Sequence, residues 1–268
     1  MAIQAKKQLG QNFLKDDEIL ERIVEAALVR KSDVIMEIGP GTGALTRVLS
    51  VQAKKVVALE VDSDLMPALL KQFPLSGNVS IIEQDILTAD VMSILQKQDI
   101  SEENPYKIVA NIPYYITAPI IQRLLELPTP PECIVLMIQK EVAERITAKV
   151  GALSILAVSV QYYADPELLF MVSKTAFDPV PKVDSAVVRL TPRYTFDKEK
   201  DKIFFRYVKA GFSSRRKTLV NNLSSHFHLS KEIVVEKLTR IGLDANIRAQ
   251  ALSIDDWKRV VEIMKPLV

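Results

Sequence analysis

The sequence predicts an α/β protein, with a doubly wound and mostly parallel sheet followed by a small all-helical domain. Three observations favour this fold class. Short β-branched runs alternate with amphipathic segments from Ser32 to about Leu190, glycines gather at one strand-to-helix turn, and the apolar spacing becomes purely helical after about residue 202. A length of 268 residues is enough for one large domain and one small one.

Seven runs rich in Val, Ile and Leu have the length and composition of strands. They are residues 34–38, 56–60, 79–83, 107–110 and 134–138, with later runs near 168–172 and 185–190. Between them, Leu45 and Leu49 mark one helix face, and Ile120 and Leu124 mark another. Because parallel strands need such crossover helices, the alternation predicts a mostly parallel sheet.

Residues 192–202 break the apolar periodicity and are interpreted as a charged linker. Helical spacing then returns around Phe204, Leu219, Ile233 and Trp257. Breaks between these helices are expected at Gly211, Ser230, Gly242 and Ser253. We therefore expect a sheet domain of residues 1–192 and a helical domain of residues 193–268.

The net charge of +2 conceals an uneven distribution along the chain. Residues 196–268 carry 15 Lys and Arg against 9 Asp and Glu, whereas the rest of the chain carries 20 against 24. A basic segment indicates a polyanionic partner such as nucleic acid, although solvated cations on helix faces give the same count.

The composition argues against membrane, disulfide and zinc-binding classes. No run approaches the roughly 18 apolar residues needed to cross a bilayer, and no apolar stretch follows Lys6 and Lys7, so we expect a cytoplasmic protein. The single cysteine, Cys133, lies in an apolar run and is expected to be a buried, unreactive thiol. With only His226 and His228, no metal site is expected.

Three of the eight glycines, Gly39, Gly41 and Gly43, lie between a predicted strand and a predicted helix. Glycine lets the backbone approach a ligand closely, and open α/β sheets bind ligands at the carboxyl ends of their strands. The spacing Gly39-x-Gly41-x-x-Ala44 also fits the dinucleotide pattern, so this turn alone does not separate NAD from S-adenosyl-L-methionine.

Acidic residues follow the next two strands. Glu60 ends one of them, 17 residues beyond Gly43, where a carboxylate can accept hydrogen bonds from both hydroxyls of a ribose. Asp85 lies just past the following strand, where it can accept from the exocyclic amine of an adenine, with Ile86 packed on the ring. Three successive strand ends thus predict one nucleoside-binding edge.

The tetrapeptide Asn111-Ile112-Pro113-Tyr114 follows the fourth strand and selects the chemistry. The lone pair of an exocyclic adenine amine is delocalised into the ring, which makes the amine a poor nucleophile. If the Asn111 side-chain oxygen and the Ile112 carbonyl accept its hydrogens, the lone pair turns toward a methyl sulfonium. Pro113 fixes the backbone that aims this carbonyl.

Two aromatic residues are candidates for holding the base. Tyr114 offers a face on which an extruded base can stack, and Phe177, in a loop stiffened by Pro179 and Pro181, can cover its other side. No general base is needed before attack, because the amine loses its proton after it has been methylated.

Together these segments resemble the ribosomal RNA adenine dimethyltransferases, and within that family the bacterial small-subunit (16S) type. The resemblance covers nearly the whole chain and rests on Leu9–Leu14, Glu37–Gly43, Leu59–Asp62, Gln84–Ile86, Asn111–Thr117, Phe177–Ser185 and Phe212–Leu219. It implies a Rossmann-like class I methyltransferase fold. Ile112 stands where the family more often has Leu, a harmless change if only the carbonyl is used.

The resemblance implies roles for individual residues. Asn12 and Leu14 would contact the methyl donor. The complete expected donor site is Asn12, Leu14, Gly39, Gly41, Glu60, Asp85, Ile86 and Asn111, and Tyr114 and Phe177 would hold the target base. The implied substrate is two adjacent adenosines near the 3′ end of 16S rRNA, each dimethylated at N6 within the 30S subunit or its precursor, by an enzyme expected to be a monomer.

The basic C-terminal residues gain a use under this interpretation. They would neutralise phosphates without reading sequence, and the candidates are Arg206, Lys209, Arg215, Arg216 and Lys217. Three alternatives stay open: a large-subunit rRNA dimethyltransferase of the macrolide-resistance type, a non-catalytic ribosome-assembly or transcription factor with the same fold, and a nicotinamide oxidoreductase.

Overall fold

The structure is a computed structural model, and it describes residue 6 and residues 9–75, 77–97, 105–193 and 196–265. The chain divides into two compact units, each treated separately below. The sheet unit consists of residues 1–143 and 164–195, and the helical unit of residues 144–163 and 196–268. In the described residues, no helix is both long and apolar enough to span a membrane.

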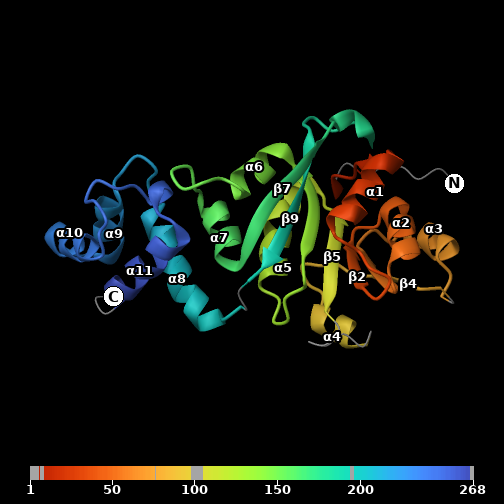
Figure 1. The fold of residues 1–268 in the computed structure, drawn as a ribbon, viewed down its shortest axis with the longest axis horizontal. Coiled ribbons are helices and arrows are strands. Elements are labelled where there is room, and N and C mark those ends of the chain that lie inside the picture. Colours follow the sequence, from red (N-terminus) through yellow and green to blue (C-terminus); the bar gives the residue numbers. More distant parts are fainter. Residues whose placement is uncertain (1–5, 7–8, 76, 98–104, 194–195, 266–268) are drawn as a thin grey trace. The chain divides into compact units, whose positions relative to one another are not determined.

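The sheet unit is built on seven strands in the order β4-β3-β2-β5-β6-β9-β7 (Figure 1). Their bounds are β2 Val34–Ile38, β3 Lys55–Glu60, β4 Val79–Glu83, β5 Tyr106–Asn111, β6 Ile134–Gln139, β7 Ala164–Val172 and β9 Ser185–Pro192. The strands from β4 to β6 pair in parallel, while β9 is antiparallel to both β6 and β7. All seven predicted strands and the mostly parallel sheet are confirmed.

Three helices cover one face of this sheet: α1 Asp17–Ala26, α2 Ala44–Gln52 and α3 Met66–Gln72 (Figure 1). Their apolar residues, such as Ile23 and Leu49, pack with strand residues such as Val109 in one core. Strand residues that alternate with this set, such as Met36 and Ile108, are also fully buried. Both faces are therefore covered, which is typical of parallel strands with long apolar runs.

The remaining sheet-unit elements connect these layers. Helices α4 Val91–Gln96 and α5 Thr117–Leu125 follow β4 and β5, with the short helix η2 Tyr114–Ile116 leading into α5. Another short helix, η3 Lys174–Ala176, follows β7. Two short strands, β1 Phe13–Leu14 and β8 Phe177–Asp178, form a separate antiparallel pair that the sequence patterns did not predict.

Within the described residues, the helical unit contains five helices, of which the last four have the expected apolar spacing and the first was not predicted from the sequence. They are α7 Ile155–Tyr163, α8 Lys198–Gly211, α9 Leu219–Phe227, α10 Lys231–Arg240 and α11 Ile254–Met264, with the short helix η4 Ala249–Ala251 before the last. Ser230 and Ser253 cap α10 and α11 as expected. Helix α6, Lys140–Ile146, spans the division between the units.

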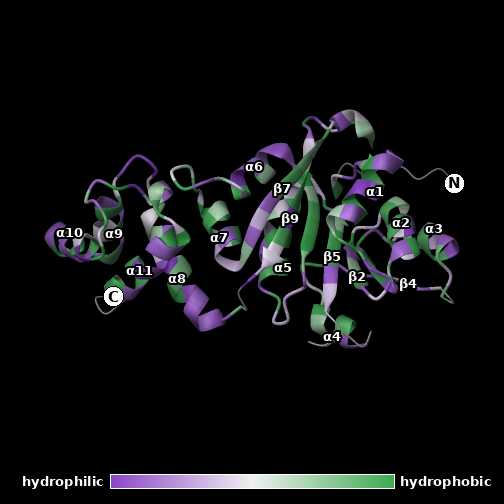
Figure 2. Cartoon of the chain, viewed as in Figure 1, coloured by the Kyte–Doolittle hydropathy of each residue, from purple (hydrophilic) through white to green (hydrophobic). Residues whose placement is uncertain are grey.

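The structure differs from the expected linker and boundary. Helix α8 begins at Lys198, inside the predicted linker 192–202, because Asp197 caps it by accepting from the Lys200 amide. Its first turn is hydrophilic, so the apolar spacing of the sequence did not reveal where the helix begins (Figure 2). Residues 144–163 group with the C-terminal helices, and the Tyr162 and Tyr163 hydroxyls both donate to the buried Asp201 carboxylate of α8.

Candidate active site

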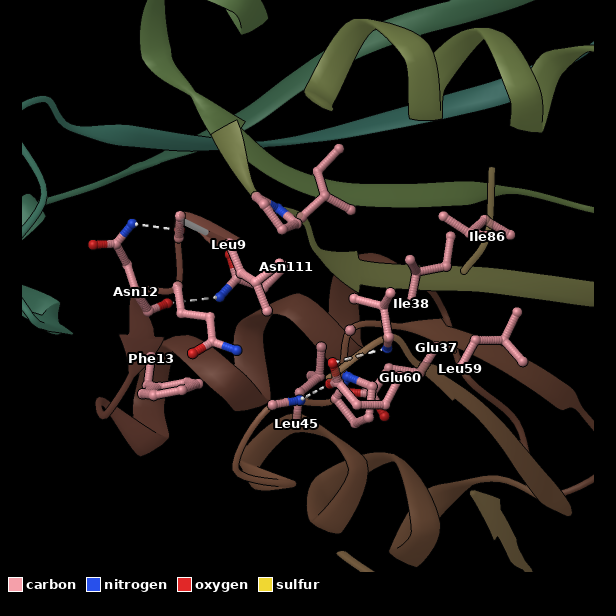
Figure 3. A pocket seen from close by; sticks show the side chains of 18 of the residues that line it. Leu9, Asn12, Phe13, Glu37, Ile38, Leu45, Leu59, Glu60, Ile86 and Asn111 are labelled. Carbon is pink, nitrogen blue, oxygen red and sulfur yellow. Dashed lines mark hydrogen bonds between the residues drawn. The ribbon is translucent and has the colours of Figure 1, made fainter. Parts of the chain in front are cut away.

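A pocket lies where the parallel strands β2, β3 and β5 end (Figure 3). It is lined by the glycine turn after β2, by the ends of β3 and β5, by residues after β4 and by the segment that precedes α1. Every residue expected to bind the donor lines it: Asn12, Leu14, Gly39, Gly41, Glu60, Asp85, Ile86 and Asn111. The tetrapeptide from Asn111 to Tyr114 also lines it.

The glycine turn requires its glycines. Gly39, Gly41 and Gly43 have φ values of +68°, +58° and +79°, in the left-handed region that residues with a β-carbon rarely adopt. A β-carbon on Gly41 would lie 3.1 Å from Cε1 of Phe13, and one on Gly43 only 2.7 Å from Cε2 of Phe73. The bare backbone therefore forms a cradle that fits the close approach of a ligand.

Glu60 is held firmly at the end of β3. Its side chain accepts three backbone hydrogen bonds, from Gly41 N at 3.0 Å through Oε2, and from Val61 N at 3.0 Å and Asp62 N at 2.9 Å through Oε1. The residue is only 4% exposed. Because a carboxylate has about four acceptor positions, Oε2 retains capacity for a ribose hydroxyl.

Asp85 and Ile86 follow β4 at the same edge. One carboxylate oxygen of Asp85, Oδ1, accepts from the Leu87 amide at 2.9 Å, and Ile86 is buried. A fixed acceptor beside an apolar side chain is suited to the edge and face of a purine ring.

The catalytic candidate Asn111 has a defined orientation. Its Nδ2 donates to the main-chain carbonyl of Asn12 at 3.4 Å, and the two residues face each other in Figure 3. Since the Asn12 carbonyl oxygen can accept only from the nitrogen of the Asn111 side-chain amide and not from its oxygen, this contact assigns Nδ2 to Asn12 and leaves Oδ1 as an acceptor for another group. An acceptor of this kind is what the proposed chemistry requires of Asn111.

Tyr114 is fixed by its hydroxyl, which lies 2.6 Å from Ser185 Oγ. Burial raises the pKa of the Tyr114 phenol above its usual value, the Ser185 hydrogen bond opposes this, and the nearby Asp184 charge adds to it. The phenol is therefore neutral at physiological pH, and its ring is held in place at the pocket.

The structure does not bring Phe177 to this pocket. The side chain is 3% exposed and belongs to the apolar core, with its backbone paired to Leu14 between β1 and β8. It is absent from the described residues that line the pocket. Its role as a second aromatic partner of the base stays a prediction.

The five basic candidates lie in the helical unit and are all exposed. Arg206 and Lys209 are on α8, and Arg215, Arg216 and Lys217 are in the connection to α9. Arg206 lies over the Phe227 ring at 5.1 Å. Among the described residues, none of the five has a salt bridge.

Sequence reasoning missed Glu37, which also lines the pocket. It is 1% exposed, and its Oε2 has no hydrogen-bond partner among the described residues. Burial raises the pKa of Glu37 to about 8, and the negative charge of Glu60 acts in the same direction. An acidic residue inside a run that otherwise reads Val-Ile-Met-Ile was the available signal.

No metal site is found in the described part of the chain, where no group of three His, Cys, Asp or Glu side chains converges. Burial raises the pKa of the single cysteine, Cys133, to about 11, as expected for an unreactive thiol.

Comparison with known proteins agrees with this geometry. A family model described as ribosomal RNA adenine dimethylase matches residues 2–265. Ribosomal RNA small subunit methyltransferase A of Alkaliphilus metalliredigens is 44% identical over 256 residues, covering 94% of this chain and 88% of its own. The protein of the same name from Bacillus pumilus is 43% identical over 267 residues, covering 97% and 91%.

Two solved structures share the fold over most of the chain. A dimethyladenosine transferase from Plasmodium falciparum has a TM-score of 0.77 and 27% identity, covering 95% of this chain and 98% of its own. The 23S rRNA methyltransferase ErmE has a TM-score of 0.73 and 28% identity, covering 95% and 100%. The chain therefore belongs to the ribosomal RNA adenine dimethylase family and is an S-adenosylmethionine-dependent rRNA methyltransferase.

Proposed function

We propose that this protein dimethylates the N6 amines of two adjacent adenosines near the 3′ end of 16S rRNA, in the 30S subunit or its precursor. The observation that carries the proposal is the fixed Asn111 amide, whose Nδ2 is used by the Asn12 carbonyl while Oδ1 stays available at the pocket. An available amide oxygen at this place can accept a hydrogen from an adenine N6.

The residues that line the pocket fit the methyl donor. The glycine turn would let the donor lie close to the protein backbone. Glu60 would accept from the donor's ribose hydroxyls, and Asp85 with Ile86 would hold its adenine. When bound, S-adenosylmethionine supplies an electrophilic methyl group on a sulfonium. We place Asn12, Leu14, Gly39 and Gly41 in the same donor site.

The chain's own residues then prepare the amine. Asn111 Oδ1 and the Ile112 carbonyl would accept the two N6 hydrogens, which redirects the lone pair toward the methyl carbon. Pro113, with φ −60° and ψ 136°, holds the backbone in an extended form that aims this carbonyl. Transfer from a bound donor would form the N6–C bond while the donor's S–C bond breaks, and the resulting ammonium would give its proton to solvent.

The basic residues of the helical unit would supply the phosphate contacts that hold structured RNA. The curated relatives quoted above, at 43–44% identity, are named as small-subunit enzymes, whereas the 23S rRNA methyltransferase is 28% identical. This difference favours small-subunit over large-subunit rRNA as the substrate. We further propose that the protein acts as a monomer in the cytoplasm, in ribosome biogenesis.

The test is transfer of tritiated methyl groups to purified 30S subunits that lack the modification, followed by nucleoside analysis. We expect N6,N6-dimethyladenosine at two adjacent positions of 16S rRNA. Preferential labelling of protein-free large-subunit rRNA would instead support the macrolide-resistance type of activity.

A further inference from the structure

A buried carboxylate, Asp62, lies two residues beyond Glu60 and is only 3% exposed. Three donors reach it: Lys6 Nζ at 2.6 Å and the Asp64 amide at 3.1 Å contact Oδ1, and Gln11 Nε2 contacts Oδ2 at 2.8 Å. Burying a carboxylate costs free energy unless it is paired. Two of these donors, Lys6 and Gln11, come from the N-terminal segment, more than 50 residues away in the sequence.

The described residues of the N-terminal segment, Lys6 and Leu9 to Asn12, hydrogen-bond to one another as well as to Asp62. The Lys6 amide donates to Gln11 Oε1 at 2.7 Å, and the Leu9 amide donates to the Lys6 carbonyl at 3.1 Å. Both ends of the Gln11 side-chain amide are therefore used, one by Lys6 and one by Asp62. Gln11 is thereby fixed in position and in orientation, and Leu9 and Gln11 both line the pocket.

Asn12 follows Gln11 directly in the chain and contacts the side-chain amide of Asn111. Because Gln11 is fixed, the Asn12 backbone is held in place beside that amide. Asn12 Nδ2 donates to the Gly10 carbonyl at 3.1 Å, and the Asn12 main-chain carbonyl accepts from Asn111 Nδ2. A free Asn side chain can rotate to present either its oxygen or its nitrogen. The Asn12 carbonyl permits only the nitrogen, so the place of this carbonyl decides which atom Asn111 offers to a substrate.

We propose that Asp62 is a positioning residue for methyl transfer, which acts through Gln11 and Asn12 to hold the Asn111 amide with its oxygen available to the target amine. The inference rests on the proposed function of Asn111. Asp62 itself is not among the described residues that line the pocket. Its backbone amide donates to Glu60, but its carboxylate accepts from Lys6, Gln11 and the Asp64 amide. Its negative charge pairs with Lys6 of the N-terminal segment.

The test compares three variants at matched positions. Asp62→Ala removes both acceptors of the N-terminal segment, and Asp62→Asn keeps one oxygen for Gln11 but loses the Lys6 ion pair. Asp64→Asn is the control, because exposed Asp64 shares Lys6 at 2.6 Å but has no contact with Gln11. In single-turnover transfer to 30S subunits, we expect Asp62→Ala to lower the rate about 10-fold or more, Asp62→Asn less, and Asp64→Asn under about 2-fold.

A double-mutant cycle separates positioning from general damage. If Asp62 acts through Asn111, then Asp62→Ala changes the residual rate of an Asn111→Ala enzyme by less than about 2-fold. Losses that multiply in the double variant would overturn the proposal, since Asp62 would then act independently of Asn111.

A measurement that does not depend on catalysis separates the positioning role of Asp62 from the methyl-transfer function proposed for Asn111. The side-chain amide NMR signals of Asn111, identified by their loss in Asn111→Ala, should shift in Asp62→Ala and stay unchanged in Asp64→Asn. Unshifted signals in folded Asp62→Ala protein would overturn the positioning role even if methyl transfer is confirmed. Shifted signals without any transfer by the wild-type enzyme would uphold the positioning chain and reject the function proposed for Asn111.

Discussion

The carboxyl edge of the sheet and the basic surface of the helical unit hold their polar groups in opposite ways. At the sheet edge Glu60 and Asn111 are tied to backbone atoms, so their orientation is set before any ligand arrives. In the helical unit Arg215 and its neighbours are exposed and, among the described residues, lack salt bridges. Methyl transfer needs a defined geometry, whereas attraction of a phosphate chain needs available charge.

The contrast is tested most strongly at Asn111. We expect Asn111→Ala to lower kcat by about 10²- to 10³-fold, the range for removing one fixed transition-state hydrogen bond, with a smaller loss of donor affinity. Single-turnover transfer and donor calorimetry measure the two effects. Equal losses in both would place Asn111 in donor binding alone.

Glu37 tests whether burial at the sheet edge carries an energetic cost. The raised pKa of Glu37, about 8 against 4.5 when unperturbed, means that the folded protein favours the protonated carboxyl. The protonated Glu37 carboxyl therefore contributes its full stabilisation of the folded protein below about pH 4.5. That stabilisation is lost as the pH rises toward 8.

Without donor, we expect the free energy of unfolding of the wild type to fall by about 2–3 kcal/mol between pH 5 and pH 7, relative to Glu37→Gln. Urea unfolding at several pH values measures it. Parallel pH profiles for the two proteins would show that Glu37 ionises normally.

Gly41 tests whether the cradle needs bare backbone. Gly41→Ala combines strain at φ +58° with a contact to Phe13, and we expect about a 10-fold loss of donor affinity. Gly151→Ala is the control, because Gly151 also has a positive φ, +102°, but a β-carbon there meets nothing within 4 Å. If both variants bind the donor like the wild type, the cradle has no role in binding.

The smallest effects are expected on the basic surface. Arg215→Ala should reduce the slope of RNA affinity against salt concentration by about one unit and leave donor affinity unchanged. Arg240→Ala is the comparison, since Arg240 already pairs with Glu236 at 2.8 Å. An equally large change of slope in Arg240→Ala would mean that Arg215 contributes no more to RNA binding than an arginine outside the five candidates.

The same two regions differ in how far the sequence predicted them. Strand runs such as 34–38 and the residues directly after them were predictable, because parallel strands bring their carboxyl ends to one edge. The burial of Phe177 in the core was not predictable, since an isolated aromatic has no periodicity that separates core from site. The start of α8 at Lys198 was missed because its first turn is charged and capped by Asp197. The contact of Gln11 with Asp62 joins residues 51 apart, which no local pattern encodes.

The most direct test is a crystal structure with a bound donor analogue and an RNA that presents an unpaired adenosine. The expected result is Asn111 Oδ1 within about 3.2 Å of the adenine N6, with Nδ2 still on the Asn12 carbonyl. A side chain rotated so that Nδ2 faces the amine, or an adenine bound away from Asn111, would contradict the proposed chemistry.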